Sequence, residues 1–185
     1  MAHRVCPWWL GYWLVSPVRK LRENPSKALA PLVGEGMLVL EPGPGMGFFT
    51  LAVARLVGPA GRVVAVDLQP KMLASLERRA NRAGLRDRIE TRRAQPAALG
   101  VADLGGRVDV ALALHVVHEL PDPPGFFAEV FAALKAGGSL LLVEPRGHVS
   151  EADFAASVAT SERVGFRAAG GIPGFWGRTA LLVKP

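Results

Sequence analysis

Apolar residues along this chain follow two alternating periods. Short runs rich in Val, Leu and Ala are typical of buried β-strands, and they alternate with segments whose apolar residues recur every three or four positions, as in helices. The runs that predict strands cover residues 37–41, 62–67, 89–93, 108–114, 139–144 and 179–184. The segments that predict helices cover residues 48–57, 71–83, 123–134 and 151–164. This alternation predicts an α/β fold with a doubly wound, mainly parallel sheet covered on both faces.

Glycine and proline mark the predicted element boundaries. Gly84 is expected to cap the C-terminus of the second helix, because glycine adopts the left-handed conformation that ends many helices. The pair Pro123-Pro124 is expected to open the third helix, and the pair Gly137-Gly138 to end it before the next strand.

The chain is long enough for one domain. Its 185 residues, half of them hydrophobic, can bury a core of ordinary size. We place this domain at residues 36–185. Residues 1–35 are expected to form a helical preamble, in which Asn24-Pro25 caps a short helix.

The stretch EPGPGMGFFT, residues 41–50, carries the first candidate site. Gly43, Gly45 and Gly47 follow the first strand and precede the first helix, where open α/β sheets bind ligands against bare backbone. The dinucleotide fingerprint GxGxxG fails, because its third glycine would fall on Phe48. Glu41 ends the strand with a carboxylate, which disfavours a phosphate and favours an ammonium group. The stretch therefore predicts a site for a cationic nucleoside, and Phe48 and Phe49 are expected to face the core.

Asp67 ends the second predicted strand, 20 residues after Gly47. A carboxylate at this position can accept hydrogen bonds from both hydroxyls of a ribose. Because NAD-dependent enzymes use the same device, Asp67 alone does not choose between cofactors.

Together, EPGPGMG and VVAVD resemble the first two motifs of the class I S-adenosylmethionine-dependent methyltransferases. The resemblance continues through VDVALALHVVHELPDP, similar to the fourth-strand motif of that family, and ALKAGGSLLLVEP, similar to its fifth. The segments GFRAAGG and GRTALLVKP are placed like the antiparallel strands that end the family fold. The resemblance implies a single Rossmann-like methyltransferase domain with a seven-stranded sheet and a C-terminal antiparallel strand.

The resemblance also implies a cofactor and its contacts. S-adenosylmethionine would lie on the three glycines and leave as S-adenosylhomocysteine. Glu41 would hold the methionine amino group, Asp67 the ribose, and Leu68 would flank the adenine. Many relatives place an acidic residue after the third strand to meet the adenine amino group. This chain offers Gln95 instead, whose amide oxygen can accept the same bond.

The implied acceptor is a small molecule. The fourth-strand motif lacks the Asn/Asp-Pro-Pro-aromatic signature of amino-group nucleic-acid methyltransferases, and no cysteine lies nearby for cytosine-carbon methylation. HVVHELPDP is most similar to the subgroup that methylates quinones, lipids and other metabolites, including arsenite. Arsenite relatives hold the metalloid with several cysteines, whereas this chain has only Cys6.

Three of the four histidines fall at the predicted carboxyl edge of the sheet. His115 directly follows the fourth strand, His118 lies one turn later, and His148 follows the fifth strand. They can line the pocket, act as a general base, or join a carboxylate in holding a metal. We assign no metal, and our catalytic hypothesis makes His118 or His148 the base and His115 the residue that orients the acceptor.

The formal charge of +6 comes mostly from arginine. Seven of the arginines lie between residues 78 and 93, and such a group can bind phosphates. No aromatic residues lie among them to stack on bases. The first three of the seven fit the solvent face of a helix whose Met72, Leu73 and Leu76 face inward. We therefore expect no nucleic-acid partner, while keeping an RNA or protein methyltransferase, a non-catalytic nucleoside-binding module and an oxidoreductase as alternatives. The arginines concerned are Arg78, Arg79, Arg82, Arg86, Arg88, Arg92 and Arg93.

The N-terminal segment CPWWLGYWLV, residues 6–15, is apolar and aromatic. It is too short to span a bilayer and lacks the small-residue cleavage site of a signal peptide. It is expected either to cover the pocket as a lid, together with His3, or to pack the preamble onto the sheet. Its tryptophans are also compatible with contact to a membrane surface. The single cysteine is compatible with a reducing environment, which predicts a cytoplasmic protein.

Overall fold

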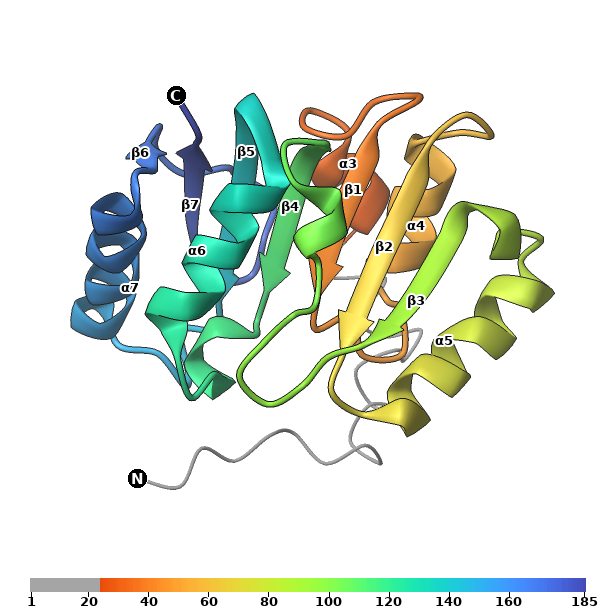
Figure 1. Cartoon of the computed structure of the whole chain (residues 1–185), viewed down its shortest axis with the longest axis horizontal. Helices are drawn as coiled ribbons and strands as arrows, with labels where there is room; N and C mark the ends of the chain where they lie inside the picture. The colour runs from red at the N-terminus through yellow and green to blue at the C-terminus, as the bar shows by residue number, and fades with distance from the viewer. Residues whose placement is uncertain (1–23) are drawn as a thin grey trace.

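A computed structural model describes residues 24–185 and contains one mixed sheet of seven strands (Figure 1). The strand order is β3-β2-β1-β4-β5-β7-β6. The first five strands in the chain pair in parallel, and β7 is antiparallel to both β5 and β6. The predicted fold class, with its antiparallel C-terminal strand, is confirmed. The strands are β1 (Leu38–Pro42), β2 (Arg62–Asp67), β3 (Ile89–Arg93), β4 (Val108–Leu114), β5 (Leu134–Glu144), β6 (Arg167–Ala168) and β7 (Arg178–Val183).

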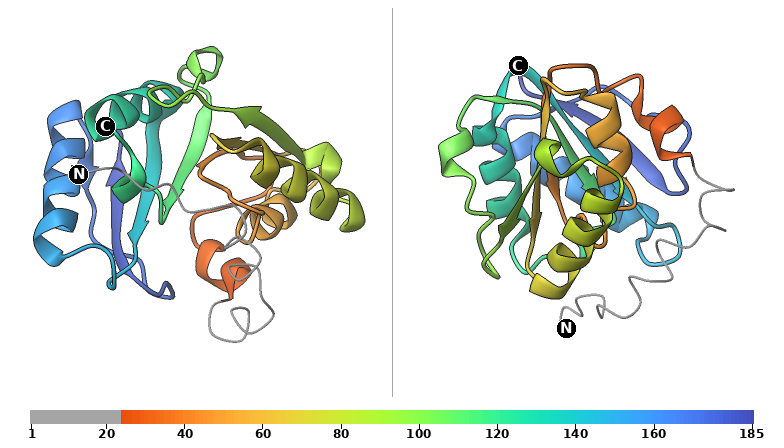
Figure 2. Two further views of the ribbon diagram at one scale, coloured as in Figure 1. Left: turned by 90° about the horizontal axis from the view of Figure 1, so that it is seen from below. Right: turned by 90° about the vertical axis from the view of Figure 1, so that its right-hand side faces the viewer.

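Helices cover both faces of this sheet (Figures 1 and 2). The helices α3, α4 and α5 pack on one face, and α6 and α7 pack side by side on the other. The α-helices are α3 (Pro25–Leu29), α4 (Thr50–Leu56), α5 (Pro70–Arg82), α6 (Pro123–Ala133) and α7 (Glu151–Val164). Three 3₁₀ turns, η2 (Arg86–Arg88), η3 (Ala102–Leu104) and η4 (Val117–Glu119), complete the connections among the described residues.

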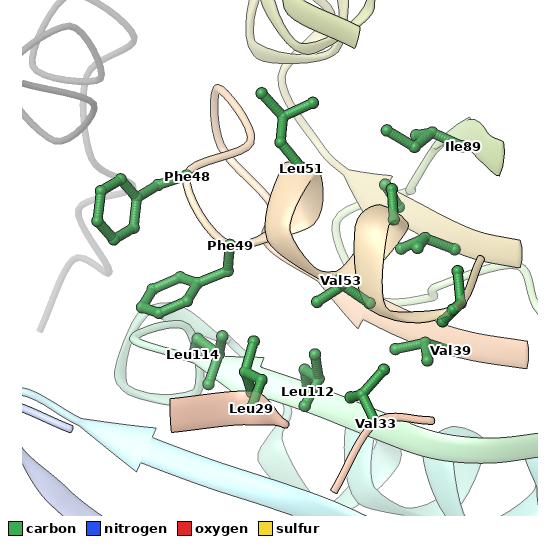
Figure 3. Close-up of a cluster of buried hydrophobic side chains, with 14 of the residues drawn as sticks. Leu29, Val33, Val39, Phe48, Phe49, Leu51, Val53, Ile89, Leu112 and Leu114 are labelled. Carbon is green, nitrogen blue, oxygen red and sulfur yellow. The ribbon is translucent and has the colours of Figure 1, made fainter. Parts of the chain in front are cut away.

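The central strands are buried on both faces, which explains their nearly continuous apolar sequences. Successive residues of a strand point to opposite faces, so that Val39 joins the core under α3, α4 and α5 while Leu40 joins the core under α6 and α7. Figure 3 shows the first of these cores, in which Val39 and Leu112 of the sheet meet Val53 of α4.

The predicted caps at three helix ends are confirmed. The Asn24 side chain accepts a hydrogen bond from the Lys27 amide at 3.1 Å at the start of α3. Pro123 opens α6, where Asp122 provides the N-cap. Gly84 follows α5 with φ +65°, and the next amide, that of Leu85, bonds to the Ala80 carbonyl at 2.9 Å, as in a Schellman motif.

The prediction for Gly137-Gly138 is wrong. Helix α6 ends at Ala133, and both glycines lie within β5, which begins at Leu134. Gly137 has φ +75°, and a Cβ on Gly138 would lie 3.1 Å from the Asp109 carbonyl of the neighbouring strand. Gly137 therefore allows a left-handed backbone and Gly138 a close approach of β4, near the register shift between β4 and β5, and neither ends a helix.

Phe48 and Phe49 are buried in the core, as predicted, but they precede α4 instead of belonging to it. Their rings meet edge to face at 5.0 Å, and Phe49 lies 6.2 Å from the ring of Phe175 in the loop before β7. Figure 3 shows both rings at the end of the core where the chain enters α4. The turn into the first helix is thus anchored by aromatic packing.

The suggested lid lies outside the described residues, together with His3 and Cys6. Of the helical preamble at residues 1–35, the structure describes α3 and the turn that follows it. Within residues 24–185, no helix is both long enough and apolar enough to cross a membrane.

Candidate functional site

The carboxyl ends of β1, β2, β4 and β5 form the lower edge of the sheet in Figure 1. Glu41 lies at the end of β1, Asp67 ends β2, His115 directly follows β4, and Glu144 ends β5. The parallel strand order therefore brings residues from four separate parts of the chain to one edge, where open α/β sheets bind ligands.

The glycine loop, residues 43–47, has three glycines in left-handed backbone conformations. Their φ values are +70° at Gly43, +54° at Gly45 and +82° at Gly47. A Cβ on Gly43 would lie 2.7 Å from Val116 after β4, and one on Gly47 would overlap Leu76 of α5. Two of the three glycines are therefore required by close packing within the protein.

Gly45 differs from its neighbours because a Cβ there would have no atom of residues 24–185 within 4 Å. Its backbone thus faces open space at the carboxyl edge of the sheet. Its amide donates to Asp67 Oδ2 at 3.2 Å, which joins the loop to β2. Of the three glycines, Gly45 is therefore the one with room beside its backbone.

Glu41 is buried, with an exposed fraction of 2%, and its Oε2 has no hydrogen-bond partner among the described residues. Burial raises the pKa of this carboxyl to about 7, the nearby Thr50 hydroxyl opposes the rise, and the negative charge of Asp67 adds to it. An unpaired carboxylate in such a position is costly, and a cationic group bound beside it would relieve the cost.

Asp67 is held by the backbone on both sides. Its Oδ1 accepts from the Gln69 amide at 2.8 Å, and its Oδ2 accepts from the Gly45 amide. Burial raises the pKa of Asp67, and the amides of Gln69, Gly45 and Leu68 oppose that rise. Since a carboxylate offers about four acceptor positions, both oxygens can still accept hydroxyl groups.

Arg79 holds the glycine loop from the side of α5. It projects from α5, and its Nη1 donates to the Met46 carbonyl within the loop. Burial lowers the pKa of its guanidinium. The sequence pattern predicts this side chain in solvent with its neighbours on α5, and that prediction is wrong, because the loop carbonyl draws it inward.

Three others of the arginine group are also bound to protein acceptors, whereas Arg78, Arg82 and Arg93 are exposed, as predicted for Arg78 and Arg82 on the solvent face of α5. Arg92 forms a bidentate pair with Asp103, with bonds of 2.7 and 2.9 Å. Arg88 bonds to the Ala54 carbonyl at 3.2 Å, and Arg86 to the Ile89 carbonyl at 2.5 Å. With these contacts, the arginines stabilise the β2–β3 side of the protein itself.

Leu68 and Gln95 lie at the same edge as Asp67. Leu68 follows β2 directly and is half-buried. Gln95 follows β3 and is exposed, in a turn where its amide donates to the Ala98 carbonyl at 2.9 Å. The Ala94 amide donates to the Asp67 carbonyl at 3.0 Å, which keeps this turn beside the end of β2.

On the other side of the edge, His118 is held by Glu144. The histidine Nδ1 lies 2.5 Å from Glu144 Oε2, and Glu144 Oε1 accepts from the amide of Val117 at 2.8 Å and of His118 at 3.3 Å. The Glu144 side chain is 1% exposed, whereas that of His118 is 26% exposed. The hydrogen bond to Glu144 raises the pKa of His118; burial opposes the rise, and the charges of Glu144 and Glu119 add to it.

The other two histidines lie close by in different settings. The His148 ring is parallel to that of His118, with centroids 6.3 Å apart. His115 has φ +62°, which makes it the only non-glycine residue with positive φ among residues 24–185, and its amide donates to the Val143 carbonyl at 2.7 Å. Such strained backbone is often found at functional positions. Within the same described range, no group of three or more His, Cys, Asp or Glu side chains is placed to hold a metal ion.

Sequence reasoning missed four residues that shape this edge. Val116 packs on the glycine loop, Thr50 lies beside Glu41, Arg79 holds the loop, and Glu144 holds His118. Only Glu144 carried a readable signal: like Glu41 and Asp67, it is an acid at the end of an apolar strand.

Comparisons with known proteins agree with this geometry. Residues 40–142 match a family described as a methyltransferase domain. The chain is 32% identical over 112 residues to a ubiquinone biosynthesis O-methyltransferase of Cereibacter sphaeroides, covering 60% of this chain and 42% of that protein. It is 30% identical over 119 residues to an arsenite methyltransferase of Halobacterium salinarum, covering 64% of this chain and 29% of that protein. The chain thus spans less than half the length of these relatives.

A solved structure shares nearly the whole fold. A SAM-dependent methyltransferase from Aquifex aeolicus superimposes with a TM-score of 0.85 at 23% sequence identity, covering 98% of this chain and 100% of that one. The family match spans both the glycine loop and the fourth-strand motif. This chain therefore belongs to the S-adenosylmethionine-dependent methyltransferase family, and S-adenosylmethionine is the cofactor of that family.

Proposed function

We propose that this chain transfers a methyl group from S-adenosylmethionine to a small-molecule acceptor. The observation that carries the proposal is the buried carboxyl of Glu41, whose Oε2 has no partner among the described residues and which lies next to the glycine loop. A carboxylate in this position lacks a cation, and the methionine part of the cofactor carries one.

The residues at the edge fit the whole cofactor. Glu41 would hold the ammonium group, the open backbone at Gly45 would lie against the ligand, and Asp67 would accept the ribose hydroxyls with its remaining acceptor positions. Leu68 and Gln95 would meet the adenine. When bound, S-adenosylmethionine supplies an electrophilic methyl group on a positively charged sulfur.

The protein's own task is to align the acceptor, exclude water and remove a proton where the acceptor has one. We assign the base to His118, because Glu144 holds its Nδ1, that bond does not engage Nε2, and the side chain is 26% exposed. His148, parallel to it, is the second candidate. His115 would orient the acceptor from its strained position after β4.

A small-molecule acceptor is supported by relatives named for ubiquinone biosynthesis and for arsenite. Arsenite is the less favoured acceptor, because this chain has a single cysteine. Trp176 supports an apolar or planar acceptor. It is 65% exposed and directly precedes Gly177, where a Cβ would lie 2.5 Å from the Glu144 carbonyl. The loop that carries Trp176 therefore passes beside the end of β5, which provides Glu144.

An RNA or protein acceptor is the second candidate, favoured only by the basic charge. The contacts of Arg79, Arg86, Arg88 and Arg92 with protein acceptors speak against a free phosphate-binding surface. Steep salt dependence of RNA binding would revive this candidate. The proposal also includes a cytoplasmic location and a covering role for the N-terminal aromatic segment, residues 6–15.

Two measurements test the proposed function. Calorimetry should show binding of S-adenosylhomocysteine and no comparable binding of NADH. Incubation of a metabolite extract with labelled S-adenosylmethionine should then give a labelled product of low mass. Cofactor binding without any labelled product would favour a non-catalytic nucleoside-binding module, and binding of NADH alone would favour an oxidoreductase.

A further inference from the structure

We infer that Glu144 is a positioning residue that fixes the tautomer and direction of His118, and that the methyl acceptor carries an acidic hydroxyl. The inference rests on the proposed function for its chemistry. Its structural part concerns only the pair formed by Glu144 and His118, and it can be tested without any acceptor.

The contacts of Glu144 leave it one orientation. Its side chain is 1% exposed at the end of β5, where Oε1 accepts from two successive amides of η4. These bonds turn Oε2 toward the His118 ring, at 2.5 Å from Nδ1. Because an ionised carboxylate only accepts hydrogen bonds, Nδ1 must carry the proton. In neutral His118, Nε2 is then the atom with the available lone pair.

Glu144 also determines what happens when His118 gains a proton. The imidazolium is stabilised on one side by the buried Glu144 carboxylate and on the other by Glu119, whose Oε1 lies 3.9 Å from Nε2. The ring of His148 also faces that of His118, stacked on it at 6.3 Å. Glu144, and to a smaller extent Glu119, therefore make His118 a stronger base than an isolated histidine, while burial opposes them.

Such a base is useful for one class of acceptor. A thiol ionises more readily than a hydroxyl and is intrinsically a strong nucleophile, and a neutral amine attacks through its own lone pair. A hydroxyl oxygen becomes a good nucleophile only as it loses its proton. In the proposed step the hydroxyl proton passes to Nε2 of His118 while the oxygen–methyl bond forms and the methyl–sulfur bond breaks. The products are a methyl ether, neutral S-adenosylhomocysteine and the imidazolium of His118. A phenol or enol, whose proton lies within reach of an imidazole, is the class that fits.

The first experiment is an NMR titration of His118 in the whole chain. In the unchanged protein, ¹⁵N shifts should show neutral His118 protonated at Nδ1, with a pKa above the ordinary value of about 6.5. Glu144→Gln should lower that pKa and allow the other tautomer. Glu119→Gln, the matched control, should lower it less, because Glu119 lies farther from the ring. Nε2 protonation in the unchanged protein, or an unaltered pKa in folded Glu144→Gln, would overturn the inference.

The second experiment reads the chemistry from the labelled product of the metabolite extract. Fragmentation should place the methyl group on oxygen. The rate should rise with pH through the raised pKa of His118, since only the neutral ring accepts a proton. Glu144→Gln should move that rise to lower pH and also reduce the plateau rate by about 10-fold or more. A plateau loss with an unmoved profile would mean a merely structural role.

The two proposals fail in different ways. Methylation on nitrogen, sulfur or carbon would overturn the hydroxyl acceptor and leave the transferase function intact. Failure to bind S-adenosylhomocysteine would overturn the transferase function, while the titration of His118 would still decide the role of Glu144.

Discussion

The two sides of the candidate site are built from different chemical groups. On the β1–β2 side, the surface offered to a ligand is largely backbone, because the glycine loop turns Gly45 toward open space and Asp67 is fastened to its amide. On the β4–β5 side, the surface is made of side chains, with His118 clamped by Glu144 and stacked on His148. Backbone suits a cofactor shared by a whole family, whereas side chains can change with the acceptor.

The comparison predicts that variants on the first side change binding and variants on the second change turnover. The largest effect is expected from Gly45→Val. A valine side chain would fill the open space over the loop, and binding of S-adenosylhomocysteine should fall below detection in calorimetry.

Gly84→Val is the matched control for this variant. Gly84 also has positive φ, at +65°, and a Cβ there would likewise have no described atom within 4 Å, but it lies at the far end of α5. Both variants should lose about 1–3 kcal/mol of stability through backbone strain, and only the first should lose binding. Equal binding in the two variants would show that the ligand lies elsewhere.

The next effect in size concerns turnover. His118→Ala should reduce the rate of methyl transfer about 100-fold or more, because the proposed proton acceptor is lost. Binding of S-adenosylhomocysteine should be unchanged. His148→Ala and His115→Ala should have smaller effects on rate. If all three variants keep near-normal turnover on the identified acceptor, the enzyme works by alignment alone.

Asp67→Ala should weaken binding of S-adenosylhomocysteine by about 2–3 kcal/mol, through loss of charge-assisted bonds to the ribose. Glu41→Ala should weaken it comparably, through loss of the partner of the ammonium group. Turnover at saturating cofactor should change much less than affinity. Calorimetry on folded variants gives the answer, and an Asp67→Ala protein with unaltered affinity would refute the assignment.

A smaller effect on cofactor affinity is expected from a change in pH. The pKa of Glu41 is raised to about 7, so the empty site keeps its proton at pH 6 and loses it by pH 8. An ammonium group pairs with the ionised form, so affinity for S-adenosylhomocysteine should increase about tenfold over this interval. Glu41→Gln should flatten the dependence. Stability of the empty protein should change in the opposite direction: it should fall as pH rises toward 7, because the folded state holds a proton that the unfolded chain releases.

The smallest effect is expected at the border of the acceptor side. Trp176→Ala should raise the KM for the acceptor a few-fold, by roughly 1 kcal/mol of lost apolar contact, without altering cofactor affinity. Trp176→Phe should retain most of the contact. A change in cofactor affinity instead would show that Trp176 belongs to the cofactor side of the site and not to the acceptor side.

The difference between the β1–β2 side and the β4–β5 side also explains which parts of the site the sequence can predict. The β1–β2 side depends on local spacing: a strand, an acid, three glycines and a helix follow one another, so the sequence alone is enough to identify Glu41 and the loop. The clamp on His118 depends on Glu144, 26 residues away, and on side-chain directions that spacing does not contain. Parallel strand order can place both residues at one edge, but it does not predict their contact.

Two predictions from the sequence differ from the structure, and each difference has a physical cause. Gly137-Gly138 resembles a helix stop because glycine often ends helices, yet within β5 Gly137 provides a left-handed backbone and Gly138 lets β4 approach closely. Arg79 has the position of a solvent-facing residue on an amphipathic helix, and an unfilled carbonyl in the glycine loop draws it inward. In both places a tertiary contact overrides a local pattern.

The sheet order has a consequence for how copies of this protein meet one another. An open sheet ends in two strands whose outer backbone groups can pair with another chain. Here one end is β6, only two residues long, and the other is β3, which carries Glu90, Arg92 and Arg93. A short end and a charged end both oppose strand-to-strand polymerisation. Of the arginines whose number suggests a phosphate partner, Arg92 and Arg93 lie on this end strand, where charge opposes pairing with another chain.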